Sequence, residues 1–157
     1  MRGGIFHEIS YDAVIRNNTF RRNGTGNDYP GWTTGAGIEV VSSRNIEVYG
    51  NTLVDNWQGI TGLNDHRGDG LHGPWVLTGL NVHNNNVTSR ITAAGGGRSG
   101  VLDTAGTDAY QGWANNRFQG NVYLLGPNAS YFTFAAQELN ESQWRGYGFD
   151  TTGSFQR

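Results

Sequence analysis

The chain repeats one pattern of apolar and polar positions. Three clear copies read apolar-x-apolar-x-x-Asn-x-apolar, and a shorter fourth copy follows, at residues 13–20, 46–53, 80–87 and 115–118. A spacing of two between apolar positions is typical of a β-strand, whereas Gly and Asn are weak helix formers. Because the pattern recurs in a fixed phase, it indicates a solenoid.

A second strand-like stretch precedes these copies and opens with Gly and an aliphatic residue, at residues 4–5, 37–38, 59–60 and 100–101. Each coil therefore contains several strands. Gly37 and Gly59 are 22 residues apart, which we take as one minimal coil. The longer spacings carry their excess in Gly-rich stretches that we expect to leave the coil as loops, at residues 24–36, 65–79 and 91–99.

The phase of the Asn residues predicts a ladder. Stacked parallel strands lie ~4.8 Å apart, so Asn side chains at equivalent turns can hydrogen-bond from coil to coil. We expect inward rungs at Asn18, Asn51, Asn85 and Asn116. We expect a core column beside them at Phe20, Leu53, Val87 and Phe118. The same alternation points the Asp103 side chain inward. Because a buried carboxylate needs partners, Asp103 either caps a turn or marks a place where the alternation is shifted. The alternative is an Asn-rich loop protein with chance spacing.

Composition narrows the classes of protein. The chain has 157 residues, 25 of them Gly, with 36% hydrophobic residues, 15% charged residues and a net charge of −2. One domain is expected, and a basic nucleic-acid binder is disfavoured. The apolar runs are too short for a transmembrane helix, and no signal peptide pattern opens the chain. Without Cys there is neither a disulfide framework nor a thiolate metal site.

The order of elements is shared by residues 4–18 and 37–56, each with a Gly-aliphatic strand followed by an Asn turn. This order resembles the right-handed parallel β-helix proteins of the pectate-lyase-like superfamily. The tail resembles the C-terminal ending of bacterial secreted proteins of this kind, at residues 121–123, 131–134, 143–144 and 148–150.

The resemblance implies an all-β, right-handed parallel β-helix of about four to five coils. Coils are expected over residues 1–125 and a capping tail over 126–157, within one domain, and a short helix is expected over 135–145 with Asn140 as its N-cap. The resemblance also implies the C-terminal portion of a longer helix, located outside the cell or at its surface. Since residues 1–3 offer little cover for the first coil, we expect a fragment or a homo-oligomer formed through that coil.

Two carboxylates are expected on the outer face of the first strands. If Ile5 and His7 point inward, Glu8 points outward, and Glu39 takes the same face in the next coil. Their backbones would then lie roughly 8 Å apart, which suits an inverting glycosidase pair. The alternative is that both are simply solvated.

The densest polar cluster is residues 64–73, where the first strand of the third coil ends. Its candidates for acid and base chemistry are Asp65, His66 and Asp69. Its candidates for sugar contacts are Arg67 and His72. A metal is less favoured here than polar sugar contacts, because the spacing matches no ligand motif and Ca²⁺, the alternative, would need more clustered carboxylates. The alternative is a mobile Gly-rich loop.

Aromatic residues in and near the loops are candidates for binding sugar rings, whose C–H faces stack on flat aromatic faces. They are Tyr29, Trp32, Trp57 and Trp75. Covering the ends of coils is the alternative role.

Residues and resemblance together predict a secreted, carbohydrate-active β-helix protein that acts on or binds an extended polysaccharide or oligosaccharide. It would be similar to a polysaccharide lyase or a glycoside hydrolase, without a cofactor and without nucleic-acid or membrane partners. A lyase needs a cation beside the uronate carboxylate. The central candidates are Arg16, Arg44, Arg67 and Arg90, and the lack of any Lys counts against a lyase. The alternative is a non-catalytic solenoid for glycan binding, adhesion or assembly.

Overall fold

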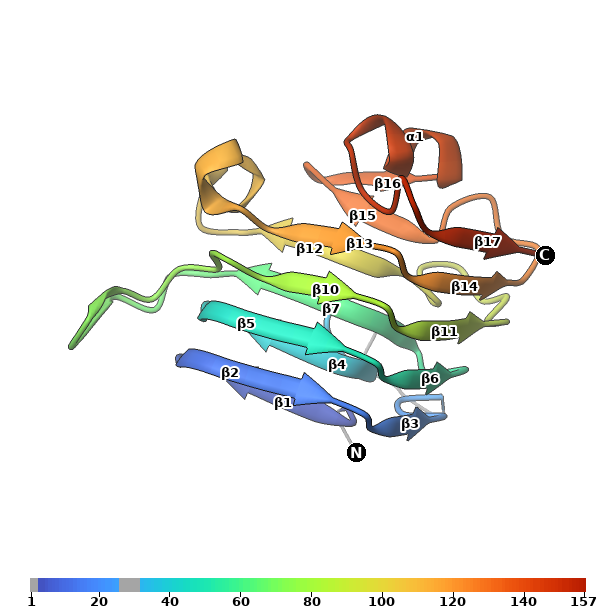
Figure 1. Cartoon of the computed structure of the whole chain (residues 1–157), viewed down its shortest axis with the longest axis horizontal. Helices are drawn as coiled ribbons and strands as arrows, with labels where there is room; N and C mark the ends of the chain where they lie inside the picture. Colours follow the sequence, from blue (N-terminus) through green and yellow to red (C-terminus); the bar gives the residue numbers. More distant parts are fainter. Residues whose placement is uncertain (1–2, 26–31) are drawn as a thin grey trace.

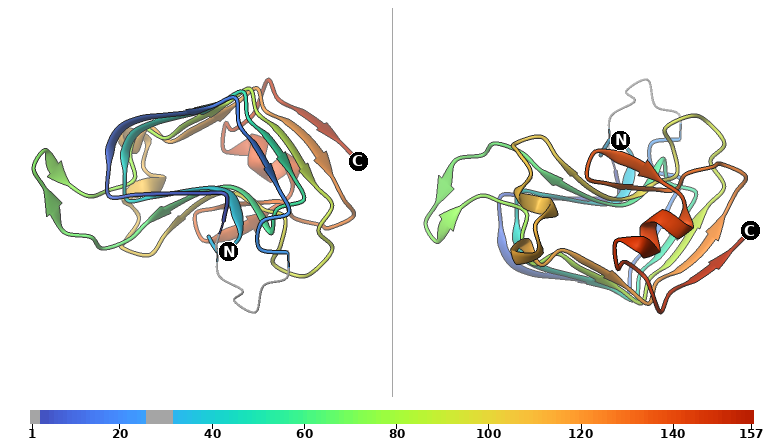
Figure 2. Two further views of the ribbon diagram at one scale, coloured as in Figure 1. Left: turned by 90° about the horizontal axis from the view of Figure 1, so that it is seen from below. Right: turned by 90° about the horizontal axis from the view of Figure 1, so that it is seen from above.

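The computed structural model describes residues 3–25 and 32–157 and shows a parallel β-solenoid of about 4 turns (Figure 1). Its strands form three sheets along the stack, and each coil contributes one strand to each sheet. Seen along the stack, the strands of successive coils lie over one another (Figure 2). The predicted all-β solenoid is therefore confirmed.

The first sheet contains, in spatial order, β1 (Ile5–Glu8), β4 (Ala36–Val41), β7 (Gln58–Asn64), β12 (Ser99–Asp103), β15 (Phe132–Phe134) and β16 (Gln137–Leu139). The second contains β2 (Tyr11–Arg16), β5 (Arg44–Tyr49), β10 (Asn81–His83) and β13 (Arg117–Gln119). The third contains β3 (Thr19–Arg21), β6 (Thr52–Val54), β11 (Asn86–Ser89), β14 (Val122–Leu125) and β17 (Ser154–Gln156). Within these sheets the pairing is parallel except between β15 and β16.

The register of the first sheet confirms the minimal coil of 22 residues. Ile5 lies beside Ile38, and Ile38 lies beside Ile60. The next coil differs from the prediction, because Gly100 lies beside Thr61. This slip of two residues leaves every side chain on its predicted face, since side chains in a strand alternate with a period of two.

The Gly that opens these strands is required by close packing against the third sheet. A Cβ atom on Gly37 would lie 2.5 Å from Leu53 Cδ2, and one on Gly4 would overlap the ring of Phe20. The Gly-aliphatic pattern of the sequence therefore marks the place where the third sheet meets the first.

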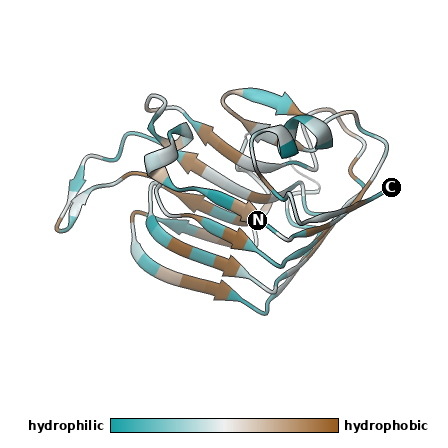
Figure 3. Ribbon diagram, turned by 45° about the horizontal axis from the view of Figure 1, so that its top comes forward, coloured by the Kyte–Doolittle hydropathy of each residue, from teal (hydrophilic) through white to brown (hydrophobic). Residues whose placement is uncertain are grey.

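Alternate strand residues form the core. Ile38 and Val40 of β4 and Ile46 and Val48 of β5 are fully buried and belong to one apolar cluster. Apolar and polar segments alternate along several of the stacked strands (Figure 3).

A ladder of side-chain hydrogen bonds runs up the turn between the second and third sheets, and its rungs are buried except for the first. In each step the backbone N–H and the side-chain amide of one rung donate to Oδ1 of the next, at 2.8–3.2 Å. The rungs are Asn18, Asn51, Asn85, Asn121 and Asp150.

The prediction that Asn116 is a rung was wrong. Phe118 lies beside Val82 in the second sheet, so the third-sheet position beside Val87 falls to Tyr123 instead. Asn115 and Asn116, which precede β13, resemble the earlier Asn pairs in sequence. In the structure the Asn116 side chain hydrogen-bonds backbone groups before β10 and in the 3₁₀ helix η1 (Asp108–Tyr110).

Asp103 caps the turn after β12, one of the two roles expected for it. It is 8% exposed. Its carboxylate accepts hydrogen bonds from the backbone N–H groups of Ala105, Gly106 and Ala109 and from Asn64 Nδ2. These bonds hold the start of the segment that contains η1 and the 3₁₀ helix η2 (Gly112–Ala114).

The C-terminal segment covers the last coil. Helix α1 (Glu141–Gly146) follows its N-cap Asn140, whose side chain accepts from Gln143 N in a capping box, as expected. The helix is shorter than predicted, because residues 137–139 form β16. Trp144 is fully buried and stacks on Phe132, with ring centroids 4.7 Å apart. In Figure 2, α1 lies across the interior of the last coil.

Candidate functional site

The polar insertion at residues 65–79 leaves the solenoid between β7 and β10. It projects from the stack as a hairpin of β8 (Asp69–Gly70) and β9 (Gly73–Pro74) (Figure 1). Its first residue is anchored to the second coil, because Asp65 N donates to Ser42 Oγ, at 3.0 Å, and Ser42 Oγ donates to Asp65 O, at 2.9 Å. The insertion then passes the corner between β1 and β2.

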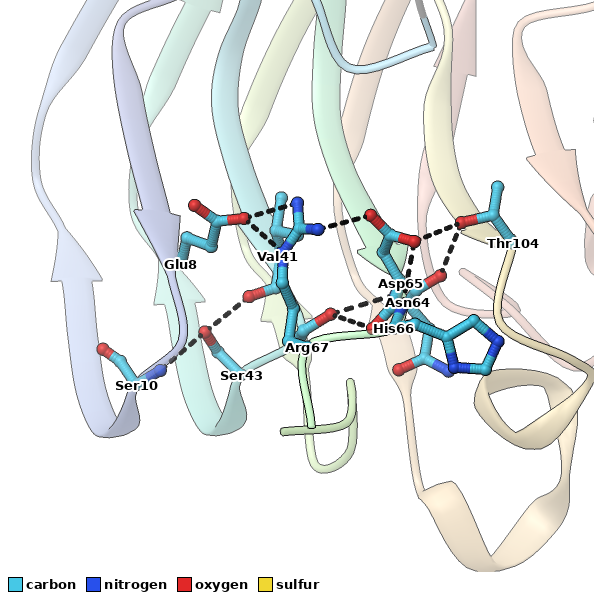
Figure 4. Close-up of polar contacts among 10 residues, drawn as sticks. Glu8, Ser10, Val41, Ser43, Asn64, Asp65, His66, Arg67 and Thr104 are labelled. Carbon is cyan, nitrogen blue, oxygen red and sulfur yellow. Dashed lines mark hydrogen bonds and ion pairs between the residues drawn. The ribbon is translucent and has the colours of Figure 1, made fainter. Parts of the chain in front are cut away.

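Arg67 links two of the predicted catalytic carboxylates at this corner (Figure 4). Its Nη2 lies 2.8 Å from Glu8 Oε1, and its Nη1 lies 2.8 Å from Asp65 Oδ2. The three side chains are about one quarter to one third exposed. Glu8 comes from the first coil and Asp65 from the third. We name Glu8, Asp65, His66, Arg67 and Thr104 the corner cluster.

Asp65 has further partners within the corner cluster. Its Oδ1 accepts from His66 N at 2.8 Å and from Thr104 Oγ1 at 3.3 Å. His66 is exposed, as is Asp69 beyond it. Because one guanidinium satisfies both Glu8 and Asp65, these carboxylates are ion-paired rather than poised as a free acid and base.

Glu39 lies away from the corner cluster. As predicted, it shares the outer face of the first sheet with Glu8, whose neighbour on β4 is Val41. However, Glu39 is only 5% exposed. Trp32, which precedes β4, reaches this sheet, because its Nε1 donates to Gly62 O at 3.2 Å. A water molecule therefore has little access to the second carboxylate of the proposed pair.

The far end of the insertion is held by contacts with Tyr11, whose ring meets those of both His72 and Trp75. The Trp75 ring stacks on Tyr11, with centroids 4.4 Å apart. Tyr11 Oη donates to Gly73 O at 2.9 Å, and Arg44 Nη1 donates to His72 O at 2.8 Å. These contacts fasten the insertion to the first and second coils, which is a structural role for Trp75.

Two other predicted aromatic residues, Trp32 and Trp57, line one pocket. We name it the tryptophan pocket, and its volume is about 310 Å³. Trp32 comes from the loop before β4, and Trp57 lies in the turn between β6 and β7. Tyr29 lies outside the described residues. The other lining residues used below are Gln58, Arg98, Gln137 and Glu138.

The polar wall of the tryptophan pocket was missed by sequence reasoning. Arg98 Nη1 lies 2.6 Å from Glu138 Oε1, and the side chains are 13% and 60% exposed respectively. Gln58 is buried and fixes the loop before β12, since its Oε1 accepts from Arg98 N and its Nε2 donates to Gly95 O, both at 2.8 Å. One signal was available: Gln58 and Arg98 both stand where a strand of the first sheet begins, Gln58 as the first residue of β7 and Arg98 directly before β12.

Within residues 3–25 and 32–157, no three His, Asp or Glu side chains gather as a metal site. None of the helices there has the length and apolar character that crossing a bilayer requires.

Comparisons of this chain with family models, with curated proteins and with solved structures find no match. The functional argument therefore rests on the geometry of the corner cluster and of the tryptophan pocket.

Proposed function

We propose that the protein binds an extended polysaccharide or oligosaccharide in the tryptophan pocket. The observation that carries this proposal is that Trp32 and Trp57, from separate loops, line one pocket together with polar side chains. Indole faces stack on the C–H faces of sugars, while neighbouring polar groups bind the hydroxyls.

The polar wall supports recognition of a sugar. Gln137 and Glu138 are exposed on β16, where they can donate to and accept from hydroxyl groups. Arg98 is mostly buried and its partner Glu138 is mostly exposed, so an acidic group of a ligand can take the place of Glu138 on the guanidinium.

Membership of the pectate-lyase-like proteins is part of the same proposal. The solenoid with three sheets and an Asn ladder supports it, as does the sequence of the tail. An extracellular or cell-surface location follows from this membership. The ligand is the expected partner, and nucleic acid and membrane are not.

Self-association through the first coil is also proposed. The strands β1, β2 and β3 stand at the edges of their sheets, and Ile5 and Phe20 are only partly buried against the core. Unpaired strand edges favour pairing with a second chain. Light scattering tests this proposal, because one chain has a mass of 17.1 kDa. A dimer is expected, and a monomer at high concentration would contradict it.

A hydrolase at the corner cluster is the second candidate. It is favoured by the approach of Glu8 and Asp65, from different coils, to one guanidinium. The ion pairs and the burial of Glu39 weigh against turnover, so binding without catalysis stands first. If a hydrolase is present, Glu8→Gln and Asp65→Asn each abolish release of reducing sugar while affinity for the glycan remains.

The binding proposal is tested by calorimetry with tetrasaccharides of β-1,4-linked glucose, xylose and mannose and of α-1,4-linked galacturonate. Trp32→Ala and Trp57→Ala should each weaken binding at least tenfold, the loss expected for one stacked ring. Gln137→Ala tests the same wall at an exposed position. Trp113→Ala is the matched control, since Trp113 is 63% exposed and does not line the pocket.

Two results would contradict the proposal. One is the absence of binding by any of the four sugars. The other is equal affinity in the wild type, both pocket variants and the control. Thermal unfolding followed by circular dichroism shows whether the variants stay folded, because the Trp32 side chain also contacts β7.

A further inference from the structure

A second polar pocket lies on the outer face of the second sheet, beside the ladder turn. We name it the second-sheet pocket, and its volume is about 420 Å³. The side chains that matter here are Glu47, Asn81, His83, Asn84, Gln119 and Thr152. None of these residues belongs to the tryptophan pocket or the corner cluster.

Three adjacent strands present this pocket in register. Glu47 of β5 lies beside Asn81 of β10, and His83 of β10 lies beside Gln119 of β13. The strands are tied together by ladder bonds at their ends, so the spacing of these groups is set before any ligand arrives. Such a preformed array loses little conformational entropy on binding.

The hydrogen bonds of His83 fix its orientation. Its ring stacks on Tyr49 with centroids 5.0 Å apart. Asn84 Nδ2 lies 3.1 Å from His83 Nδ1, so Nδ1 is the acceptor and Nε2 carries the proton. His83 Nε2 then donates to Glu47 Oε1 at 3.1 Å. Glu47 Oε2 keeps its lone pairs for a ligand.

Polar groups without partners gather in the second-sheet pocket. Asn81 Oδ1 is buried and has no hydrogen-bond partner among the described residues. The side chains of Gln119 and Thr152 are exposed and likewise make no hydrogen bond within the described part of the chain. A buried acceptor without a donor costs free energy, which a ligand that supplies the donor recovers.

The chemistry of these groups selects the ligand. Glu47 Oε2 and Asn81 Oδ1 need donors, whereas the Gln119 amide and the Thr152 hydroxyl can both donate and accept. Among the described lining residues only Glu47 has a fixed charge, so the pocket does not favour an anion. Vicinal hydroxyl groups of an uncharged sugar match this set, because each donates one hydrogen bond and accepts others.

We propose that the second-sheet pocket is a second glycan subsite, which takes an uncharged sugar unit. The choice of ligand rests on the proposed glycan-binding function, whereas the residues are separate from the tryptophan pocket. A glycan held at both places would bind more tightly than at either one, through the raised effective concentration of its second segment.

The test is nuclear magnetic resonance titration of the ¹⁵N-labelled protein with the uncharged tetrasaccharides of glucose, xylose and mannose. The side-chain amide signals of Asn81 and Gln119 should shift and saturate. In Gln119→Ala, the Asn81 signal should need about tenfold more sugar to reach half-saturation, which is the effect of losing one or two hydrogen bonds. Gln156→Ala is the matched control, because Gln156 is exposed on the third sheet and should leave the titration unchanged.

The outcomes separate the two proposals. Signals of the tryptophan pocket that shift while those of Asn81 and Gln119 stay in place would overturn the second subsite and leave the first. A shift of the Asn81 signal that persists unchanged in Gln119→Ala would also overturn it. Shifts at Asn81 and Gln119 alone, unaffected by Trp32→Ala, would support this subsite and overturn the first.

Discussion

The last rung of the ladder is a carboxylate, and replacing it should destabilise the whole solenoid. Asp150 is fully buried. Its Oδ1 accepts from Asn121 N at 3.0 Å and from Asn121 Nδ2 at 2.8 Å. Its Oδ2 accepts from Tyr123 Oη at 2.9 Å and from Trp144 Nε1 at 3.0 Å. Asp150 therefore joins the last coil to the cap through four donors.

The substitution Asp150→Asn keeps the shape and removes half of the accepting capacity. If the new amide oxygen faces Asn121, its NH₂ group faces the other two donors. The Tyr123 hydroxyl can rotate and accept, but Trp144 Nε1 can only donate and loses its partner. A lost bond to a charged group and a buried donor left unpaired each cost about 1–3 kcal/mol, part of which is offset because a buried charge is removed. We expect a loss of about 3 kcal/mol.

Urea denaturation followed by circular dichroism measures this loss. For a chain of this size it corresponds to a fall in Tm of roughly 6–12 °C. Asp12→Asn is the matched control. Asp12 also has a positive φ, 53° against 44° for Asp150, but it is exposed and accepts one bond from Asn45 Nδ2. The control should change stability by less than about 0.5 kcal/mol. Equal stability of the two variants would refute the reasoning.

Three further predictions concern the Asn ladder, Tyr123 and the ion pair of Asp55 with Arg90. Asn51→Ala removes a fully buried rung and should cost about 2–4 kcal/mol in urea denaturation, whereas Asn18→Ala, at the exposed end of the ladder, should cost less than about 1 kcal/mol. Burial raises the pKa of Tyr123 well above its ordinary value near 10. The native state thus keeps a proton that the unfolded state loses, and stability should fall as pH rises above about 10, with a smaller slope in Tyr123→Phe. The hydrogen bond from Arg90 lowers the pKa of Asp55. Stability from this pair is present above the ordinary Asp pKa and is lost as pH falls through the lowered value, so Arg90→Gln should raise the Asp55 pKa in a carbon-detected titration.

The repeat made the fold predictable because successive coils stack and so carry the same residue type at equivalent positions. Asn51 and Asn85 could be assigned from phase alone, since their coils keep the same local spacing. Asp150 could not, because the last rung is supplied by the cap and differs in residue type. Asn116 misled the prediction because spacing in one coil does not show which of two adjacent sheets a short strand joins.

The candidate sites were less predictable because they depend on the paths of the inserted loops. Phase placed Glu8 and Glu39 on one face, and this was correct. It could not show that Arg67, at the start of a long insertion, returns to Glu8, or that Glu39 is buried. It also could not show that Arg98 pairs with Glu138, because the two residues are far apart in sequence and the repeat does not relate their positions.

The proposed binding site includes part of the cap. Glu138 on β16 lines the tryptophan pocket together with Trp32, Trp57 and Arg98 from earlier segments of the chain. The turn before β12 is positioned by the Gln58 side chain at the start of β7, and β16 is positioned by its antiparallel pairing with β15. A ligand in this pocket therefore contacts the cap and two coils at once. Because such a ligand binds only when these parts are in place, its binding free energy adds to the stability of the cap.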